Sequence, residues 1–212
     1  DEFGHNITTG GATVSLTTNL GTLVGVTNGT TVNAVDQGNG TYTAKLTGTT
    51  VGTATVTGTL NGNPILDNAT VTIGPAAPAN LTKTGGDGQS ASVGAAVTVD
   101  PSVHVADQYG NPVPGVTITF AVTGGGGSVT LGTPVTDASG NAAVGSWTLG
   151  SGPATNALQA SASPVGTTTP VSFAGYVPPT AVNDSSQAMG NTQLGSSLTP
   201  NVLTAGDATI NG

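Results

Sequence analysis

The chain of 212 residues contains no cysteine and no arginine, and Lys45 and Lys83 are its only lysines. Without cysteine it can form neither a disulfide framework nor a thiolate nucleophile or metal ligand. Two lysines cannot neutralise a row of phosphates, so nucleic-acid binding is excluded. The formal net charge of −8 also argues against docking on anionic lipid. The lack of cysteine fits a bacterial exported protein better than a small eukaryotic secreted domain.

Long apolar runs are also missing. No run approaches the roughly 18 residues of a membrane helix, so we expect no membrane insertion of this segment. No signal peptide is visible, and we expect Asp1 to begin a mature or excised segment. Disordered chains combine low hydropathy with high net charge. Here the mean hydropathy is +0.11 and charged residues make up only 6%, so the chain is expected to fold.

Alternation of apolar and polar residues recurs along the chain. Residues 116–123 carry large apolar side chains at even positions and Thr or Ala at odd positions, which predicts a half-buried strand. Residues 41–47, 53–60 and 69–73 show the same pattern. Asn-Gly pairs, as at residues 61–62, favour tight hairpin turns. Many short strands, frequent turns and few helix-forming residues predict an all-β sandwich or barrel.

Two proline-containing segments divide the chain, at residues 74–78 and 177–180. Proline cannot donate to a strand ladder and stiffens a linker. We therefore predict three domains, at residues 1–74, 78–177 and 180–212. The middle one has the usual size of a β-sandwich.

An internal repeat supports this division. Residues 1–6 and 107–112 share an acidic, polar, aromatic, Gly, polar order, and residues 36–42 resemble 137–142. The members of each pair lie about one domain length apart. Residues 78–106 precede the first motif in the middle domain, but nothing precedes it in the first domain. We therefore predict that the first domain lacks its opening strands and that the third is partial.

The turn motifs carry a resemblance to a known family. Residues 107–116, with the sequence Asp-Gln-Tyr-Gly-Asn-Pro-Val-Pro-Gly-Val, resemble the turn of bacterial immunoglobulin-like repeats of the invasin and intimin type. Residues 136–142 and 36–44 resemble other turns of these repeats. The resemblance covers about residues 1–177 and implies tandem immunoglobulin-like domains of a large surface adhesin. Residues 180–212 resemble the start of a cadherin-like repeat.

Titratable residues are scattered singly, mostly beside Gly or Asn, where a carboxylate caps backbone amides of a turn. The ten acids are Asp1, Glu2, Asp36, Asp67, Asp87, Asp100, Asp107, Asp137, Asp184 and Asp207. The two histidines, His5 and His104, fall in a turn and a strand pattern, and no serine lies in a Gly-x-Ser-x-Gly context. We therefore expect no catalytic residue, no cofactor-binding residue and no enzymatic activity.

Calcium is the one cofactor with candidate ligands. Adhesin arrays often bind calcium between domains through oxygen ligands, and Asp107, Asp137 and Asp184 lie near domain ends. No Asp-x-Asp cluster exists, and single carboxylates bind calcium weakly. The three residues are thus weak calcium candidates, and turn capping is the favoured interpretation.

Three other features have a structural and a functional interpretation. Trp147 suits a sandwich core better than a sugar-stacking platform. Tyr42 is expected to hydrogen bond to upstream backbone, as tyrosine does in such sandwiches. Residues 124–127, four glycines without a following lysine, predict a flexible loop between strands rather than a phosphate loop.

Three functions remain open. The leading one is a structural stalk segment of a secreted or cell-surface adhesin that projects a distal binding region. Its partners would be neighbouring domains of the same long chain, and a host or cell-surface receptor would bind other regions of that chain. The second is a filament subunit, with residues 180–212 as a donor strand and the gap in the first domain as acceptor. The third is a carbohydrate-binding module, which the aromatic content of 3% disfavours.

Overall fold

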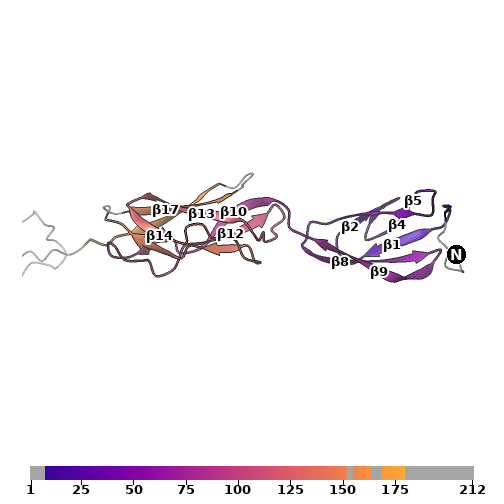
Figure 1. Cartoon of the computed structure of the whole chain (residues 1–212), viewed down its shortest axis with the longest axis horizontal. Helices are drawn as coiled ribbons and strands as arrows, with labels where there is room; N and C mark the ends of the chain where they lie inside the picture. Colours follow the sequence, from indigo (N-terminus) through magenta and orange to yellow (C-terminus); the bar gives the residue numbers. More distant parts are fainter. Residues whose placement is uncertain (1–7, 152–154, 164–168, 180–212) are drawn as a thin grey trace, which may run out of the picture. The chain divides into compact units, whose positions relative to one another are not determined.

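The computed structural model describes residues 8–151, 155–163 and 169–179 (Figure 1). Its contacts divide the chain into two units, Asp1–Pro178 and Pro179–Gly212. Every regular element in the described residues is a β-strand. The predicted all-β class is confirmed. Within these residues, no helix is long and apolar enough to cross a membrane.

Nine strands form the first sandwich. They are β1 (Val14–Thr18), β2 (Thr22–Val24), β3 (Asn28–Gly29), β4 (Thr31–Asn33), β5 (Val35–Asp36), β6 (Tyr42–Thr43), β7 (Lys45–Thr47), β8 (Gly52–Leu60) and β9 (Asn63–Ile73). The largest sheet has the order β4-β1-β8-β9, and β3-β2-β7 and β5-β6 form the smaller ones. All of these pairs are antiparallel.

The second sandwich follows a short proline-containing linker at residues 74–77. Its strands are β10 (Pro78–Gly85), β11 (Gln89–Ser90), β12 (Ser102–Asp107), β13 (Thr117–Gly124), β14 (Gly127–Thr130), β15 (Asn141–Ala143), β16 (Ser146–Leu149), β17 (Thr155–Ser163) and β18 (Val171–Tyr176). The sheets have the orders β10-β12-β15, β11-β18-β17-β13 and β14-β16. The pairing of β11 with β18 is parallel, and the other pairings are antiparallel.

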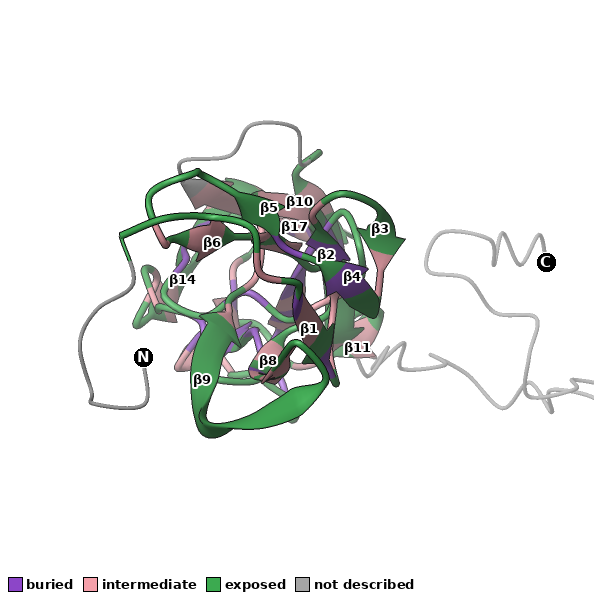
Figure 2. Ribbon diagram, turned by 90° about the vertical axis from the view of Figure 1, so that its right-hand side faces the viewer, coloured by how far each residue is buried: buried purple, intermediate pink, exposed green. Residues whose placement is uncertain are grey.

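The predicted strands are present, and their burial differs. In β13, Ile118 and Phe120 are buried while the Thr residues between them are exposed, as the alternation predicts. The turn at residues 61–62 joins β8 to β9, and both of its φ angles are positive, at 47° and 85°. The prediction for residues 69–73 was wrong in one respect, because β9 is exposed on both faces until Ile73 (Figure 2). No described strand covers its apolar side.

The main hydrophobic core lies in the second sandwich. Trp147, Ile118, Leu149 and Leu158 have no exposed surface, and the rings of Phe120 and Phe173 lie 6.2 Å apart between centroids. The prediction that Trp147 is a core residue is confirmed. The first sandwich has a smaller set of buried apolar side chains among its described residues: Val14, Leu23, Val32, Ala34 and Ala54.

Candidate functional site

The most constrained polar group in the described chain is the Asp107 carboxylate, at the end of β12. One of its oxygens, Oδ1, accepts hydrogen bonds from the backbone N–H groups of Tyr109 and Asn111, both at 2.9 Å. The other, Oδ2, accepts from the backbone N–H of Ala76 and from Asn111 Nδ2, again at 2.9 Å. The side chain has no exposed surface. The carboxylate thus caps its own turn and holds the linker before β10.

Hydrogen bonds to its oxygens keep the Asp107 carboxyl ionised. Burial raises the pKa of Asp107, but the bonds from the Asn111 side chain and from the amides of Ala76, Asn111 and Tyr109 outweigh it and lower the pKa to about 2. Four donors occupy the roughly four acceptor positions of a carboxylate. The ionised group therefore has little acceptor capacity left for a cation, which supports turn capping.

Asn111 extends this turn toward the first sandwich. Its Nδ2 also donates to the carbonyl oxygen of Thr49 at 2.7 Å, and its Oδ1 accepts from the backbone N–H of Val51 at 3.3 Å. The turn at residues 107–111 therefore contacts the residues that precede β8 as well as the linker.

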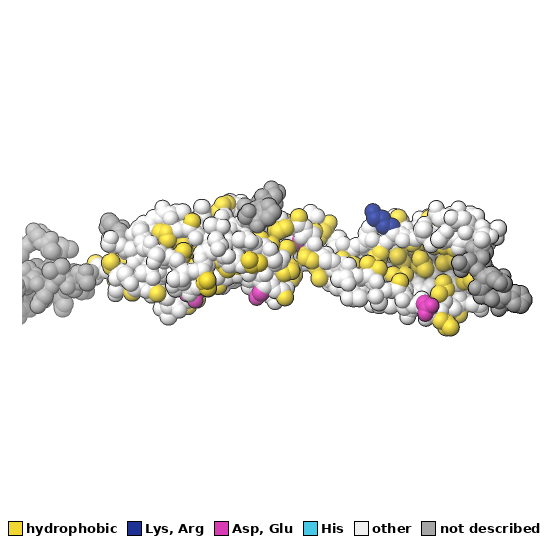
Figure 3. Space-filling model, in the orientation of Figure 1, with side chains coloured by type: hydrophobic (Ala, Val, Ile, Leu, Met, Phe, Trp, Pro, Cys, Tyr) yellow, Lys and Arg dark blue, Asp and Glu magenta, His cyan; other side chains and the backbone are white. Residues whose placement is uncertain are grey.

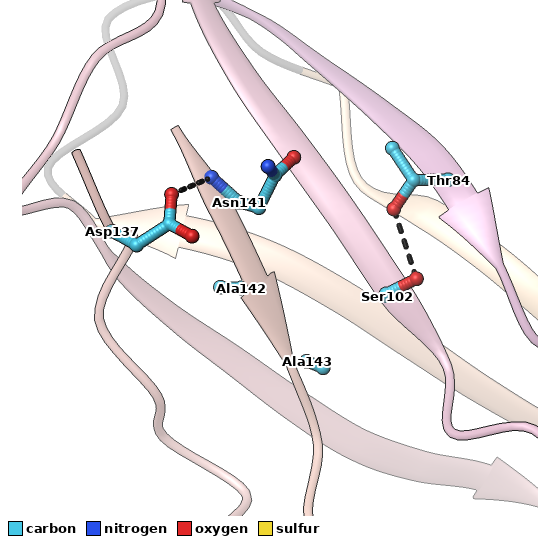
Figure 4. A pocket seen from close by; sticks show the side chains of 6 residues that line it. All are labelled: Thr84, Ser102, Asp137, Asn141, Ala142 and Ala143. Atoms are coloured by element: carbon cyan, nitrogen blue, oxygen red, sulfur yellow. Dashed lines mark hydrogen bonds between the residues drawn. The ribbon is translucent and has the colours of Figure 1, made fainter. Parts of the chain in front are cut away.

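Asp137 forms a second turn of the same kind. Its Oδ1 accepts from the backbone N–H groups of Ser139 at 2.8 Å and Asn141 at 2.9 Å. Beside it lies a hollow of about 430 Å³ (Figure 4). Its lining residues are Thr84, Ser102, Asp137, Asn141, Ala142 and Ala143. Hydroxyl groups, an amide and one carboxylate provide no nucleophile–base pair there.

The calcium candidates are not brought together by the described fold. Asp107 and Asp137 serve separate turns, and Asp184 lies outside the described residues. Across the described ranges, no group of three or more His, Asp or Glu side chains could hold a metal ion. The calcium assignment stays a prediction. His5 is also outside the described residues, while His104 lies in β12 between buried Val103 and Val105.

The first sandwich repeats the acidic turn. Asp36 Oδ1 accepts from Gly38 N at 2.8 Å, as Asp137 does from Ser139 N, and Asp36 Oδ2 accepts from Gly11 N at 2.7 Å. The hydrogen bond from Gly38, followed by that from Gly11, lowers the pKa of Asp36. The repeat read from the sequence is therefore also a repeat of hydrogen bonding.

Tyr42 behaves as predicted. Its hydroxyl oxygen accepts a hydrogen bond from the backbone N–H of Ala12, thirty residues upstream, at 2.9 Å. Three contacts were not predicted, two of them made by Lys83 and the third by Asp107. Lys83 pairs with Asp87 and lies 5.6 Å from the ring centroid of Phe173. The i,i+4 spacing of Lys83 and Asp87 was the only available signal for the first contact, and nothing in the sequence indicated the bond from Ala76 to Asp107.

Comparison with known protein families finds one matching model. The family model of invasin domain 3 matches residues 1–76. The matched range covers the first sandwich, which is therefore similar to invasin domain 3. The resemblance to invasin and intimin-type repeats is therefore confirmed, while the cadherin-like start at residues 180–212 lies outside the described residues. No curated protein matches the chain.

Three solved bacterial structures are similar to this chain, and the first of them shares its fold. Yersinia pseudotuberculosis InvD is 21% identical with a TM-score of 0.52, and the match covers 82% of this chain and 49% of that one. The adhesin InvE of the same species is 27% identical with a TM-score of 0.40, covering 84% and 52%. The Escherichia coli adhesin FdeC is 21% identical with a TM-score of 0.49, covering 78% and 54%. The chain spans about half the length of these structures.

Proposed function

We propose that this chain is a structural stalk segment of a secreted or cell-surface bacterial adhesin, which projects a distal binding region. The observation that carries the proposal is the hydrogen bond that the Asp107 carboxylate accepts from the backbone N–H of Ala76 in the linker. Because the accepting carboxylate is buried and fixed by three further bonds within its own turn, this one bond restricts the linker at Ala76. Proline at both Pro75 and Pro78 restricts it further. A stalk requires this stiffness between successive domains.

The hydrogen bonding of the acidic turns supports a mechanical role. The carboxylates of Asp36, Asp107 and Asp137 are engaged by backbone amides of turns. The similar solved structures include two bacterial adhesins, InvE and FdeC. We propose that the partners of this segment are the neighbouring domains of one long extracellular chain, that any host receptor binds through other regions, and that the segment has no enzymatic activity.

The carbohydrate-binding alternative has less support. Trp147 is fully buried and presents no ring to a sugar, while the exposed aromatic side chains among the described residues are Tyr109 at 54% and Tyr176 at 48%. They belong to different parts of the second sandwich, one in the turn after β12 and the other at the end of β18.

A distance measurement tests linker stiffness. The chain has no native cysteine, so Asp67→Cys and Thr119→Cys introduce two exposed spin-label positions, one in each sandwich. We expect a narrow distance distribution from pulsed electron paramagnetic resonance, and a broader one after Asp107→Asn. Asp100→Asn, at an exposed position in the same sandwich, is the control. A distribution as broad in the parent as in Asp107→Asn would contradict a stiff linker.

A binding measurement tests the location of adhesion. We expect the purified chain not to bind host cells or glycan arrays, because the proposed stalk carries no receptor site. Tight binding by the isolated chain would show that this segment is itself the adhesive part.

A further inference from the structure

Asparagine is followed by glycine at three places in the described part of the chain, at residues 28–29, 39–40 and 61–62. In such a pair the backbone nitrogen of the glycine can attack the side-chain carbonyl carbon of the asparagine, because glycine has no Cβ to obstruct the approach. The attack requires a backbone that can rearrange and a carbonyl oxygen whose developing negative charge is stabilised. The three pairs differ in both respects.

Two of the pairs are held by regular structure. Asn28–Gly29 forms β3, and its pairing with β2 fixes both residues. Residues 61–62 form the turn between β8 and β9, and Asn61 is tied to Thr13 twice. Its backbone N–H donates to the carbonyl oxygen of Thr13 at 2.8 Å, and its Oδ1 accepts from the backbone N–H of Thr13 at 2.9 Å. A rearrangement at either pair would break strand pairing or these bonds.

The third pair lies in the loop between β5 and β6, where the Asn39 side chain is exposed. Its Oδ1 accepts two hydrogen bonds, one from the backbone N–H of Thr41 at 3.0 Å and one from the Thr41 hydroxyl. Both donors belong to the loop itself. The described contacts of this side chain therefore allow the loop to rearrange without breaking a bond to a distant strand.

The two donors suit the chemistry of the attack. Negative charge develops on Oδ1 as the side-chain carbonyl carbon of Asn39 becomes tetrahedral. Donors that already point at this oxygen stabilise the charge without having to reorganise. Gly40 has a φ of 86°, in a region that favours glycine. The loop thus combines a nucleophile without a Cβ and an oxygen with two donors.

The acidic turns of the second sandwich lack this combination. Asn111 is followed by Pro112, whose nitrogen has no hydrogen to lose. Asn141 is followed by Ala142, which carries a Cβ and is only 7% exposed. Among the three acidic turns, the one at Asp36 alone has an asparagine followed by glycine.

We propose that Asn39 is a site of spontaneous deamidation and that Thr41 is its positioning residue. The Gly40 nitrogen loses its proton to water as it bonds to Cγ of Asn39, and Nδ2 takes up a proton and leaves as ammonia, which closes a succinimide ring. Water then opens the ring. Opening at the side-chain carbonyl gives aspartate at position 39, and opening at the main-chain carbonyl gives isoaspartate. The sum is one water consumed and one ammonia released, with no oxidation or reduction.

Isoaspartate at this position would weaken the attachment of residues 11–12. Asp36 of β5 pairs with Tyr42 of β6, and each holds that segment. Asp36 Oδ2 accepts from Gly11 N at 2.7 Å, and the Tyr42 hydroxyl oxygen accepts from Ala12 N at 2.9 Å. Isoaspartate adds a carbon atom to the main chain between the two strands, so the pairing that aligns these acceptors must shift. The modification is therefore a one-way loosening of the first sandwich.

The products also change the charge of the chain. Few Asp or Glu side chains, drawn in magenta, lie on the face of the molecule that Figure 3 shows. Each deamidation adds one negative charge to a formal net charge of −8. Anion-exchange chromatography can therefore separate reacted from unreacted chain. The proposal does not depend on the stalk function.

The test is ageing of the purified full chain in mildly alkaline buffer, followed by peptide mapping with mass spectrometry. This resolves the replacement of an amide by a carboxyl at each asparagine, and electron-transfer fragmentation distinguishes isoaspartate from aspartate. We expect Asn39 to react at least about tenfold faster than Asn28 and Asn61, as preorganised donors to the oxyanion predict. Equal rates at the three positions, or a faster reaction at Asn61, would overturn the proposal.

Matched substitutions test the role of Thr41. Thr41→Val removes the hydroxyl donor to Asn39 Oδ1, whereas Thr41→Ser keeps it. We expect deamidation several-fold slower in Thr41→Val and close to the parent rate in Thr41→Ser. Synthetic peptides of residues 35–43 with the same substitutions should react at equal rates, because they lack the folded loop. An unchanged or faster reaction in the Thr41→Val chain would contradict the positioning role.

Hydrogen exchange tests the structural consequence. We expect the amides of residues 11–12 to exchange at least about tenfold faster in the isoaspartate form than in fresh chain, with β17 unchanged, because the loosened bonds no longer oppose local opening. Equal exchange of residues 11–12 in the two forms would show that the modification leaves this attachment intact and would overturn the proposed loosening.

Discussion

At the scale of single residues, the carboxylates of Asp36, Asp107 and Asp137 cap the backbone amides of turns. Asp107 shows why: a carboxylate that follows a strand and precedes a Gly-containing turn lies close to the free amides of that turn. The same logic applies to Asp36 and Asp137, each of which accepts from the amide two residues ahead. Acidic turns of this kind hold a loop in shape through hydrogen bonds from its backbone amides.

Replacing Asp107 tests how much its hydrogen bonds contribute to the stability of the second sandwich. We expect Asp107→Asn to lower the urea midpoint of the second sandwich, because the amide loses one acceptor oxygen and leaves buried donors unpaired. The transition can be followed by fluorescence of Trp147, the only tryptophan, which is buried in that core. Asp100→Asn, at an exposed site, should leave the midpoint nearly unchanged. Equal midpoints in the two variants would contradict the assigned role.

The lowered pKa of Asp107 also predicts a pH dependence. Its pKa is about 2 in the folded chain, against an ordinary value of 3.8. Its contribution to stability is therefore fully present above about pH 4 and is lost as the pH falls toward 2. We expect the difference in urea midpoint between the parent and Asp107→Asn to shrink over this interval. A difference that stays constant from pH 6 to pH 2 would show that the charge is unimportant.

At the scale of elements, glycine sets the connection between β13 and β14. Gly126 and Gly127 have φ angles of 76° and 92°, in a region that favours glycine. The two differ in surroundings. A Cβ at Gly127 would lie 2.2 Å from the carbonyl oxygen of Thr148, whereas the nearest atom to one at Gly126 is 3.9 Å away. The predicted loop is thus a tight link whose geometry is partly imposed by β16.

These two glycines form a matched pair for mutation. We expect Gly126→Ala to cost about 1–2 kcal/mol of unfolding free energy, from the left-handed backbone alone. Gly127→Ala should cost more, because Thr148 must also move. Denaturation followed by Trp147 fluorescence measures both. A smaller loss for Gly127→Ala than for Gly126→Ala would contradict the assigned contact with Thr148.

At the scale of the whole molecule, the two sandwiches differ in how much apolar surface they bury. The second has a continuous core around Trp147 and Phe173, while β9 of the first is exposed along nearly its whole length. We expect the amides of β9 in the parent chain to exchange faster than those of β17, because few buried contacts oppose local opening. Hydrogen exchange with peptide-level resolution measures this, and slower exchange in β9 would be inconsistent with its exposure.

Calcium dependence is a further whole-molecule prediction. The acceptor positions of the Asp107 carboxylate are filled by protein donors, and no described acidic cluster surrounds it. We therefore expect sedimentation and the melting temperature to be the same with calcium and with a chelator. A chelator-dependent change would assign a functional metal site to the chain and would support Asp137 and Asp184 as calcium ligands.

Much of the fold could be predicted from local pattern. The alternation in residues 116–123 identified β13 and its buried face, and the Asn-Gly pair at residues 61–62 identified a hairpin. The exposure of β9 on both faces could not be predicted in this way. Alternation shows which side chains can face a core, but whether a second sheet covers them depends on strands elsewhere in the chain.

The sequence by itself determined the all-β class, the repeat of acidic turns and the absence of chemistry that needs cysteine or many basic groups, because composition and residue spacing act locally. Only the tertiary structure decided that Asp107 binds the linker at Ala76 and that β9, the last strand of its described sheet, is exposed. Both depend on contacts between residues distant in sequence, and such contacts are fixed by how strands pair and pack rather than by any local pattern.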